Sequence, residues 1–151
     1  MKYFIMFQLL VPGLVYATDY TGSIIPPFPE GVENRGGVLV DFQHTNELKW
    51  SQNLVKINNT DYLWLNTFVE RKEKKAYFKV AHQLELSTAS DMVLYFASCM
   101  NKKTDEQNIT GLASGKADQE WHHHVAKAWK PNITTGKIEA VEITNIICHN
   151  E

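Results

Sequence analysis

The sequence predicts an all-β protein, a two-layer antiparallel β-sandwich of the immunoglobulin-like or jelly-roll type with one disulfide. Short segments in the middle of the chain alternate between polar and apolar residues. Turn-forming residues separate these segments at regular intervals, and few long helical patterns occur. Such spacing is typical of two packed antiparallel sheets. We expect one domain over residues 38–151.

The first 17 residues, MKYFIMFQLLVPGLVYA, are typical of a secretory signal peptide. One lysine precedes an apolar run, and small side chains near Ala17 suit cleavage after that residue. An uncleaved membrane anchor is the alternative, but the run is shorter than the ~20 residues a span needs and Pro12 interrupts it. We therefore expect a secreted, extracellular protein (periplasmic in a bacterium) without a membrane span.

Residues 18–37 are rich in proline and glycine, so we expect an irregular N-terminal arm. Strands are expected after it, at 38–43, 53–57, 62–70, 76–86, 92–100 and 137–148. Asn58-Asn59-Thr60-Asp61 fits a hairpin turn, and the charged run 71–75 fits a solvated one. Residues 101–120 are polar and are expected to form a loop.

Two of these strands have clear patterns. Residues 76–86 place Ala76, Phe78, Val80, His82, Leu84 and Leu86 on one face, as in a half-buried antiparallel strand. Residues 92–100, MVLYFASCM, are apolar on both faces, as in a central strand.

The two cysteines, Cys99 and Cys148, are expected to pair, because an oxidising compartment favours disulfides. The bond would link the last strand to a central one. A reactive free thiol is the alternative.

Three N-glycosylation sequons begin at Asn58, Asn108 and Asn132, all in expected turns or loops. In a eukaryotic host they would carry glycans.

The stretch EWHHHVAKAW, residues 120–129, raises the question of a metal site. If it is a strand, His122 and His124 share a face and could bind one zinc ion. The third ligand would be His44, His82, His149 or Glu120, although His82 on an apolar face suits a satisfied core histidine. If the stretch is a helix, the histidines are scattered and the pair is lost.

Residues 62–70, YLWLNTFVE, place Tyr62, Trp64 and Phe68 on one face and aliphatic residues on the other. If the aliphatic face is core, the aromatic face is an exposed platform for a protein or sugar. The alternative is that a loop or a second layer buries it.

The chain lacks a nucleophile elbow and a phosphate-binding glycine loop, and its net charge of −2 gives no reason to expect nucleic acid as a partner. The sequence therefore favours a non-catalytic binding protein that recognises a protein or carbohydrate through loops or one sheet face, without a cofactor. One alternative is a secreted metal-dependent enzyme using the His-x-His pair. Another is a structural subunit that pairs through a sheet edge.

Overall fold

The computed structural model describes residues 18–41, 46–114, 120–122 and 124–150, which form two antiparallel sheets and, within these ranges, no helix. The expected all-β sandwich class is confirmed. The expected signal peptide and His44 lie outside the described residues. The strands are β1 (Ile24–Ile25), β2 (Val32–Val40), β3 (Trp50–Ile57), β4 (Thr60–Lys72), β5 (Lys75–Leu86), β6 (Val93–Asn101), β7 (Ile109–Ala113), β8 (Trp121–His122), β9 (Val125–Asn132), β10 (Lys137–Ala140) and β11 (Ile146–His149).

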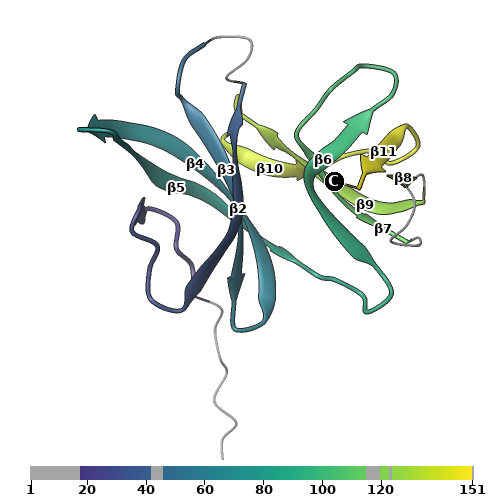
Figure 1. Ribbon diagram of the computed structural model, residues 1–151, viewed down its shortest axis with the longest axis horizontal. Coiled ribbons are helices and arrows are strands. Elements are labelled where there is room, and N and C mark those ends of the chain that lie inside the picture. Colours follow the sequence, from purple (N-terminus) through teal and green to yellow (C-terminus); the bar gives the residue numbers. More distant parts are fainter. Residues whose placement is uncertain (1–17, 42–45, 115–119, 123, 151) are drawn as a thin grey trace, which may run out of the picture.

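The chain completes one sheet before it starts the other (Figure 1). The first sheet has the order β1-β5-β4-β3-β2, and the second has the order β10-β9-β7-β6-β11-β8. In the second sheet β11 returns to lie beside β6, so β11-β6-β7-β9 follows the order of a Greek key. The immunoglobulin arrangement instead distributes successive strands between both sheets.

The β3–β4 hairpin turns where the sequence predicts it. Asn58 and Asn59 have φ angles of 49° and 64°, and Ile57 pairs with Thr60 across the turn. Asparagine is one of the few residue types that adopts this left-handed backbone readily, which is why it favours two-residue hairpins.

The N-terminal arm is shorter than expected, because β2 begins at Val32 and not at residue 38. In the sequence, Gly36 and Gly37 indicate irregular structure. In the fold a Cβ atom on Gly36 would lie 3.3 Å from the Phe96 ring of the second sheet. The glycine permits this close approach between the sheets and does not interrupt the strand.

The prediction that residues 101–120 form a loop is also partly wrong. This segment contains β7, whose five residues are all buried near the centre of the second sheet. The expected last strand is divided into β10 and β11 by residues 141–145. Residues 121–122 belong to β8 and residues 125–132 to β9, which are not neighbours in the second sheet, so the stretch is not the single strand that would place His122 and His124 on one face.

Three apolar clusters stabilise the molecule. The outer cluster lies between the arm and the first sheet and includes Ile25, Val55, Tyr62, Trp64 and Val80. The inter-sheet cluster joins Leu63, Leu65 and Leu86 of the first sheet to Ile138, Phe96 and Trp129 of the second. The second-sheet cluster surrounds the disulfide and includes Tyr95, Ile109, Val125 and Ala128. Both sheets therefore bury side chains on both faces.

The expected disulfide is confirmed. Cys99 of β6 and Cys148 of β11 are direct register partners, so the bond joins two neighbouring strands of one sheet. Within the described part of the chain, no helix is long and apolar enough to cross a membrane.

Candidate functional site

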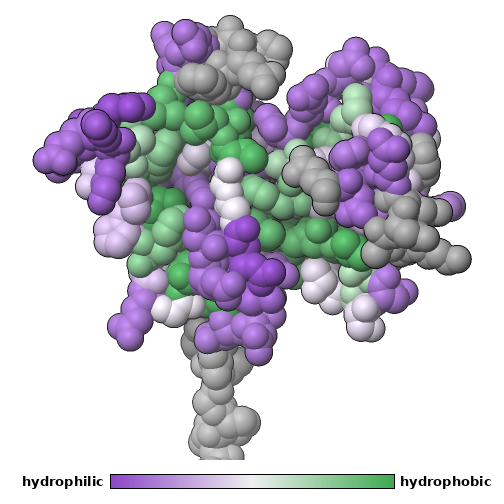
Figure 2. All heavy atoms as spheres, viewed as in Figure 1, coloured by the Kyte–Doolittle hydropathy of each residue, from purple (hydrophilic) through white to green (hydrophobic). Residues whose placement is uncertain are grey.

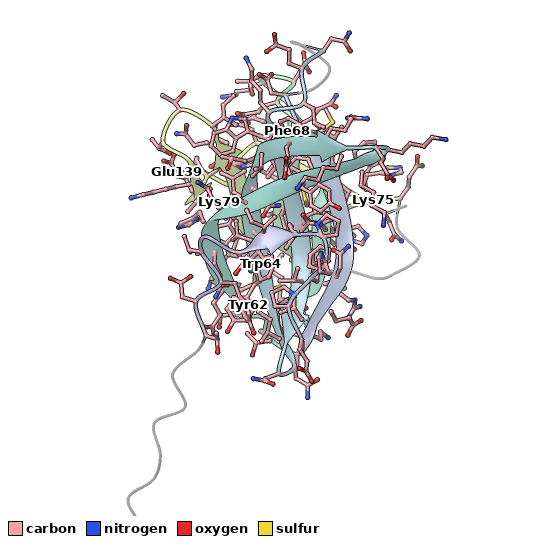
Figure 3. The ribbon with its side chains drawn as sticks, turned by 90° about the vertical axis from the view of Figure 1, so that its left-hand side faces the viewer. Tyr62, Trp64, Phe68, Lys75, Lys79 and Glu139 are labelled. Atoms are coloured by element: carbon pink, nitrogen blue, oxygen red, sulfur yellow. A yellow bond between two sulfur atoms is a disulfide. The ribbon has the colours of Figure 1, made fainter. Side chains whose placement is uncertain are left out.

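The aromatic face of β4 is covered, so the alternative in which a loop buries it is the correct one and the exposed platform is wrong. Trp64 is 0% exposed and Tyr62 is 7% exposed. Phe28 stacks on the Trp64 ring at 6.1 Å between centroids, and Tyr20 contacts the same ring at 5.4 Å. Figure 3 shows the arm and β1 crossing in front of the sheet at this position. The third residue, Phe68, is half-buried and meets Phe78 edge-on at 5.9 Å.

Gln83 holds the arm over this face. Its Oε1 accepts hydrogen bonds from the Trp64 indole at 3.0 Å and from the Tyr20 backbone N–H at 3.3 Å. Its Nε2 donates to the Thr18 carbonyl at 3.0 Å. The sequence shows the alternation of β4 but not these contacts, two of which link residues more than 60 positions apart.

The two histidines of the proposed zinc pair have different environments. His122 is 1% exposed, and its ring lies 4.8 Å from that of Tyr95. His124 is exposed, beyond the end of β8. Nearby, Nε2 of His149 lies 3.7 Å from a carboxylate oxygen of Glu120. The described residues contain no cluster of three or more histidine, cysteine, aspartate or glutamate side chains suited to a metal. The zinc site therefore stays a prediction.

His82, another candidate ligand, has a structural partner. Its Nδ1 accepts a hydrogen bond from the Ile138 backbone N–H at 3.1 Å, which connects β5 to β10. Burial lowers the pKa of His82, and the positive charge of Lys137 lowers it further, while Asp19 acts in the opposite direction. The neutral imidazole is therefore favoured in the folded state.

The three sequons also differ in their surroundings. Asn58 is exposed at the tip of the β3–β4 hairpin. Asn108 is half-buried, and Thr110 of its sequon is 0% exposed and accepts a hydrogen bond from the Ala97 N–H. Asn132 closes a turn, with Oδ1 accepting from the Thr134 N–H and Nδ2 donating to Glu139. Glycosylation itself stays a prediction.

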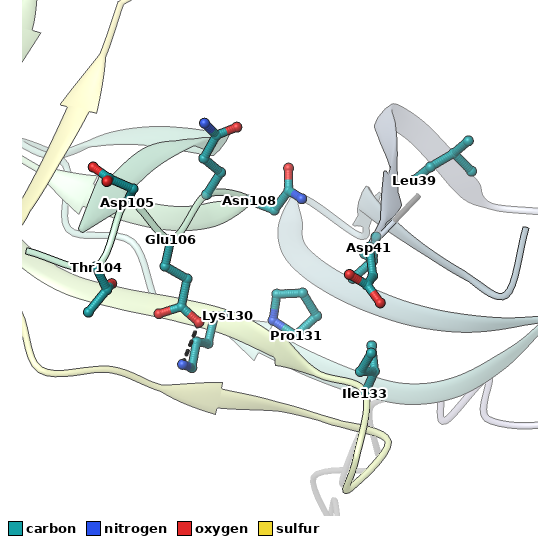
Figure 4. A pocket seen from close by; sticks show the side chains of 11 residues that line it. Leu39, Asp41, Thr104, Asp105, Glu106, Asn108, Lys130, Pro131 and Ile133 are labelled. Carbon is teal, nitrogen blue, oxygen red and sulfur yellow. Dashed lines mark hydrogen bonds and ion pairs between the residues drawn. The ribbon is translucent and has the colours of Figure 1, made fainter. Parts of the chain in front are cut away.

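A groove between the two sheets has a volume of about 530 Å³ (Figure 4). We call it the inter-sheet groove. Residues 39–41 at the end of β2 form one side, and residues 104–108 together with Lys130, Pro131 and Ile133 form the other. In Figure 2 it opens at the top, between the two lobes of the molecule. Its size is within the range of sites that hold small ligands.

The groove is acidic. Its lining includes three carboxylates (Asp41, Asp105 and Glu106) and one ammonium group, Lys130. Lys130 pairs with Glu106 at 2.7 Å, as the dashed line in Figure 4 shows. The lining therefore has an excess of negative charge, which attracts positively charged groups.

Three residues that line the groove have left-handed backbone conformations. Asp41, Asp105 and Asn108 all have left-handed φ angles, between 55° and 61°. Hydrogen bonds hold the 101–106 turn: the Asp105 N–H donates to the Asn101 carbonyl, and the Asn101 N–H donates to the Glu106 carbonyl. Asparagine and aspartate adopt this conformation more readily than other non-glycine residues, so these positions mark turns at the edge of the groove. Sequence reasoning missed this groove because its lining comes from three segments that are far apart in the sequence, residues 39–41, 104–108 and 130–133.

No protein-family model matches this chain, and no curated protein or solved structure matches it either. The geometry of the described residues is therefore the basis for a functional proposal.

Proposed function

We propose that the protein is a non-catalytic binding protein, and that the inter-sheet groove binds a basic segment of a partner protein. The observation that carries this proposal is the acidic lining of a groove built from both sheets. A lysine or arginine side chain would be attracted by the excess of negative charge in this lining. A neutral sugar carries no charge, so the negative charge of the groove would not attract it.

A charged groove affects mainly the rate and the specificity of association. Binding of this kind weakens as salt screens the charges, over a length of about 8 Å at physiological ionic strength. The proposal therefore predicts a strong dependence of affinity on ionic strength.

The test is a calorimetric titration of the protein with acetyl-Lys-Arg-Lys-Arg-amide at low and high salt. Acetyl-tetraglutamate-amide and chitotetraose serve as an acidic and a neutral comparison. The double variant Asp105→Asn/Glu106→Gln should weaken binding of the basic peptide about tenfold or more. The control, Glu33→Gln/Glu70→Gln, removes two carboxylates from the first sheet that also have Arg35 and Lys72 as partners.

Equal weakening in the groove variant and in the control would contradict the proposal, because the attraction would then be a property of the whole surface. Tighter binding of chitotetraose would favour a carbohydrate ligand instead.

The structural-subunit alternative would need an accessible sheet edge, and β2 is the nine-residue edge strand of the first sheet. However, it has a bulge between Asn34 and Gly36 and carries the charged residues Glu33 and Arg35. Bulges and charges are features that oppose edge-to-edge pairing. We therefore prefer the groove to the edge as the site of recognition.

A further inference from the structure

We propose that a second pocket, between the arm and the outer face of the first sheet, binds a neutral small molecule with one apolar ring and a hydroxyl group. We call it the arm pocket. It has a volume of about 250 Å³ and lies beside the covered aromatic face. The proposal concerns a different ligand class from that of the inter-sheet groove and does not depend on it.

The walls of the arm pocket are apolar. Ile25, Pro26 and Phe28 form the side contributed by the arm, and Ala76 and Phe78 of β5 form another. Phe78 is held in place by its edge-on contact with Phe68. The arm that covers Trp64 therefore also forms one wall of this pocket.

The floor of the arm pocket is polar. Ser51 and Asn53 of β3 line it, and Asn66 of β4 is hydrogen bonded to both of them. Asn66 Nδ2 donates to Ser51 Oγ at 3.1 Å and to Asn53 Oδ1 at 2.8 Å. Asn53 Nδ2 in turn donates to Asn34 Oδ1 at 3.1 Å, so a chain of amides crosses three strands.

One group of this network can bind a ligand. Ser51 lines the arm pocket, and its Oγ accepts a hydrogen bond from Asn66 Nδ2, so its own hydroxyl proton can be donated into the pocket. The hydroxyl oxygen of a ligand can accept this hydrogen bond without bringing a charge into the pocket.

The lining also excludes charged ligands, because none of the residues that line the arm pocket is ionisable. An ion moved into such a site would lose its hydration without a compensating charge. The volume is below the roughly 300–1,000 Å³ of sites for drug-sized molecules, so a single ring is the appropriate size.

The test uses three probes that differ in one group: benzyl alcohol, toluene and benzoate. Each is titrated into the full mature chain while ¹H–¹⁵N spectra follow the amides of Ser51, Asn53 and Phe78. We expect saturable shifts at these amides with benzyl alcohol and toluene, and none with benzoate.

Two variants locate the site and identify the polar contact. Ala76→Trp adds a large side chain to the wall and should abolish binding of both neutral probes. Ala126→Trp, at an exposed position in β9 of the second sheet, should leave binding unchanged. Ser51→Ala should weaken the binding of benzyl alcohol about fivefold, because one net hydrogen bond supplies a factor of that size. The same variant should leave the binding of toluene unchanged.

Absence of saturable shifts with both neutral probes would overturn the proposal. Binding that persists in Ala76→Trp would overturn the location. If Ser51→Ala weakens the binding of both probes equally, the variant has changed the shape of the pocket, because toluene has no hydroxyl group. The hydrogen bond assigned to the ligand hydroxyl is then wrong. None of these outcomes changes the expected result for the basic peptide, so the two sites are tested separately.

Discussion

A single imidazole, His82, couples the two sheets through a hydrogen bond that depends on its protonation. Its Nδ1 accepts from the Ile138 N–H, and a protonated ring would lose that acceptor. The pKa of His82 is lowered from its ordinary value of 6.5, mainly by burial. The folded state therefore binds a proton at this ring less readily than the unfolded chain does.

The stabilising effect of this lowered pKa is fully present above pH 6.5 and is lost as pH falls from there through the lower pKa of the folded state. The variant His82→Asn keeps an acceptor oxygen that does not titrate. Urea denaturation between pH 7.5 and 5 should show that the wild type loses more stability than the variant. Parallel pH profiles would contradict this role, since the other histidines are common to both proteins.

At the scale of elements, the arm and β4 depend on each other. Trp64 is fully buried beneath Phe28 and Tyr20, so Trp64→Ala should lower the free energy of unfolding by about 3–5 kcal/mol. Trp121→Ala is the matched control. Trp121 is 39% exposed, so its removal should lower the free energy of unfolding much less. Chemical denaturation of both variants gives the comparison. Equal losses would mean that the arm does not protect the aromatic face in solution.

The close contact between β7 and the disulfide explains why sequence analysis missed this strand. A Cβ atom on Gly111 would lie 2.7 Å from Cys99 Sγ and 2.8 Å from Cys148 Sγ. Glycine is therefore required by tertiary packing, whereas in a sequence it indicates a turn or a weak strand. The turn at Asn58 depends on local chemistry, and for that reason it could be predicted. The expected single apolar face of β5 is wrong, because a bulge between the Leu65–His82 and Asn66–Val80 pairs places Val80 in the outer cluster and Leu86 in the inter-sheet cluster.

The same contact gives a test by double-mutant cycle. Gly111→Ala should destabilise the wild type by about 1–3 kcal/mol, because the added methyl group overpacks the site. In a Cys99→Ala/Cys148→Ala background the sulfur atoms are absent, so the same substitution should cost much less. Thermal unfolding of the four proteins measures the coupling. An unchanged penalty would show that the strain arises elsewhere in β7.

At the scale of the whole molecule, the two sheets share the inter-sheet cluster, and the groove exists only where their strand ends meet. This juxtaposition of residues 39–41 with 104–108 is a property of the topology. Sequence patterns identify which side of a strand is buried, but they do not show which strand ends become neighbours. The sandwich class could therefore be predicted, and the location of the groove could not.

The disulfide acts at this scale as well, because its 49-residue separation spans nearly all of the second sheet. Closing a loop of that length lowers the entropy of the unfolded chain, which stabilises the folded state by about 4 kcal/mol in the chain-entropy model. Cys99→Ala/Cys148→Ala should lose about that much stability. Because Leu63 and Leu65 pack with Phe96 and Trp129 across the sheets, unfolding should still occur in one transition. Hydrogen exchange that accelerates in the second sheet while the first remains protected would show instead that the two sheets unfold independently.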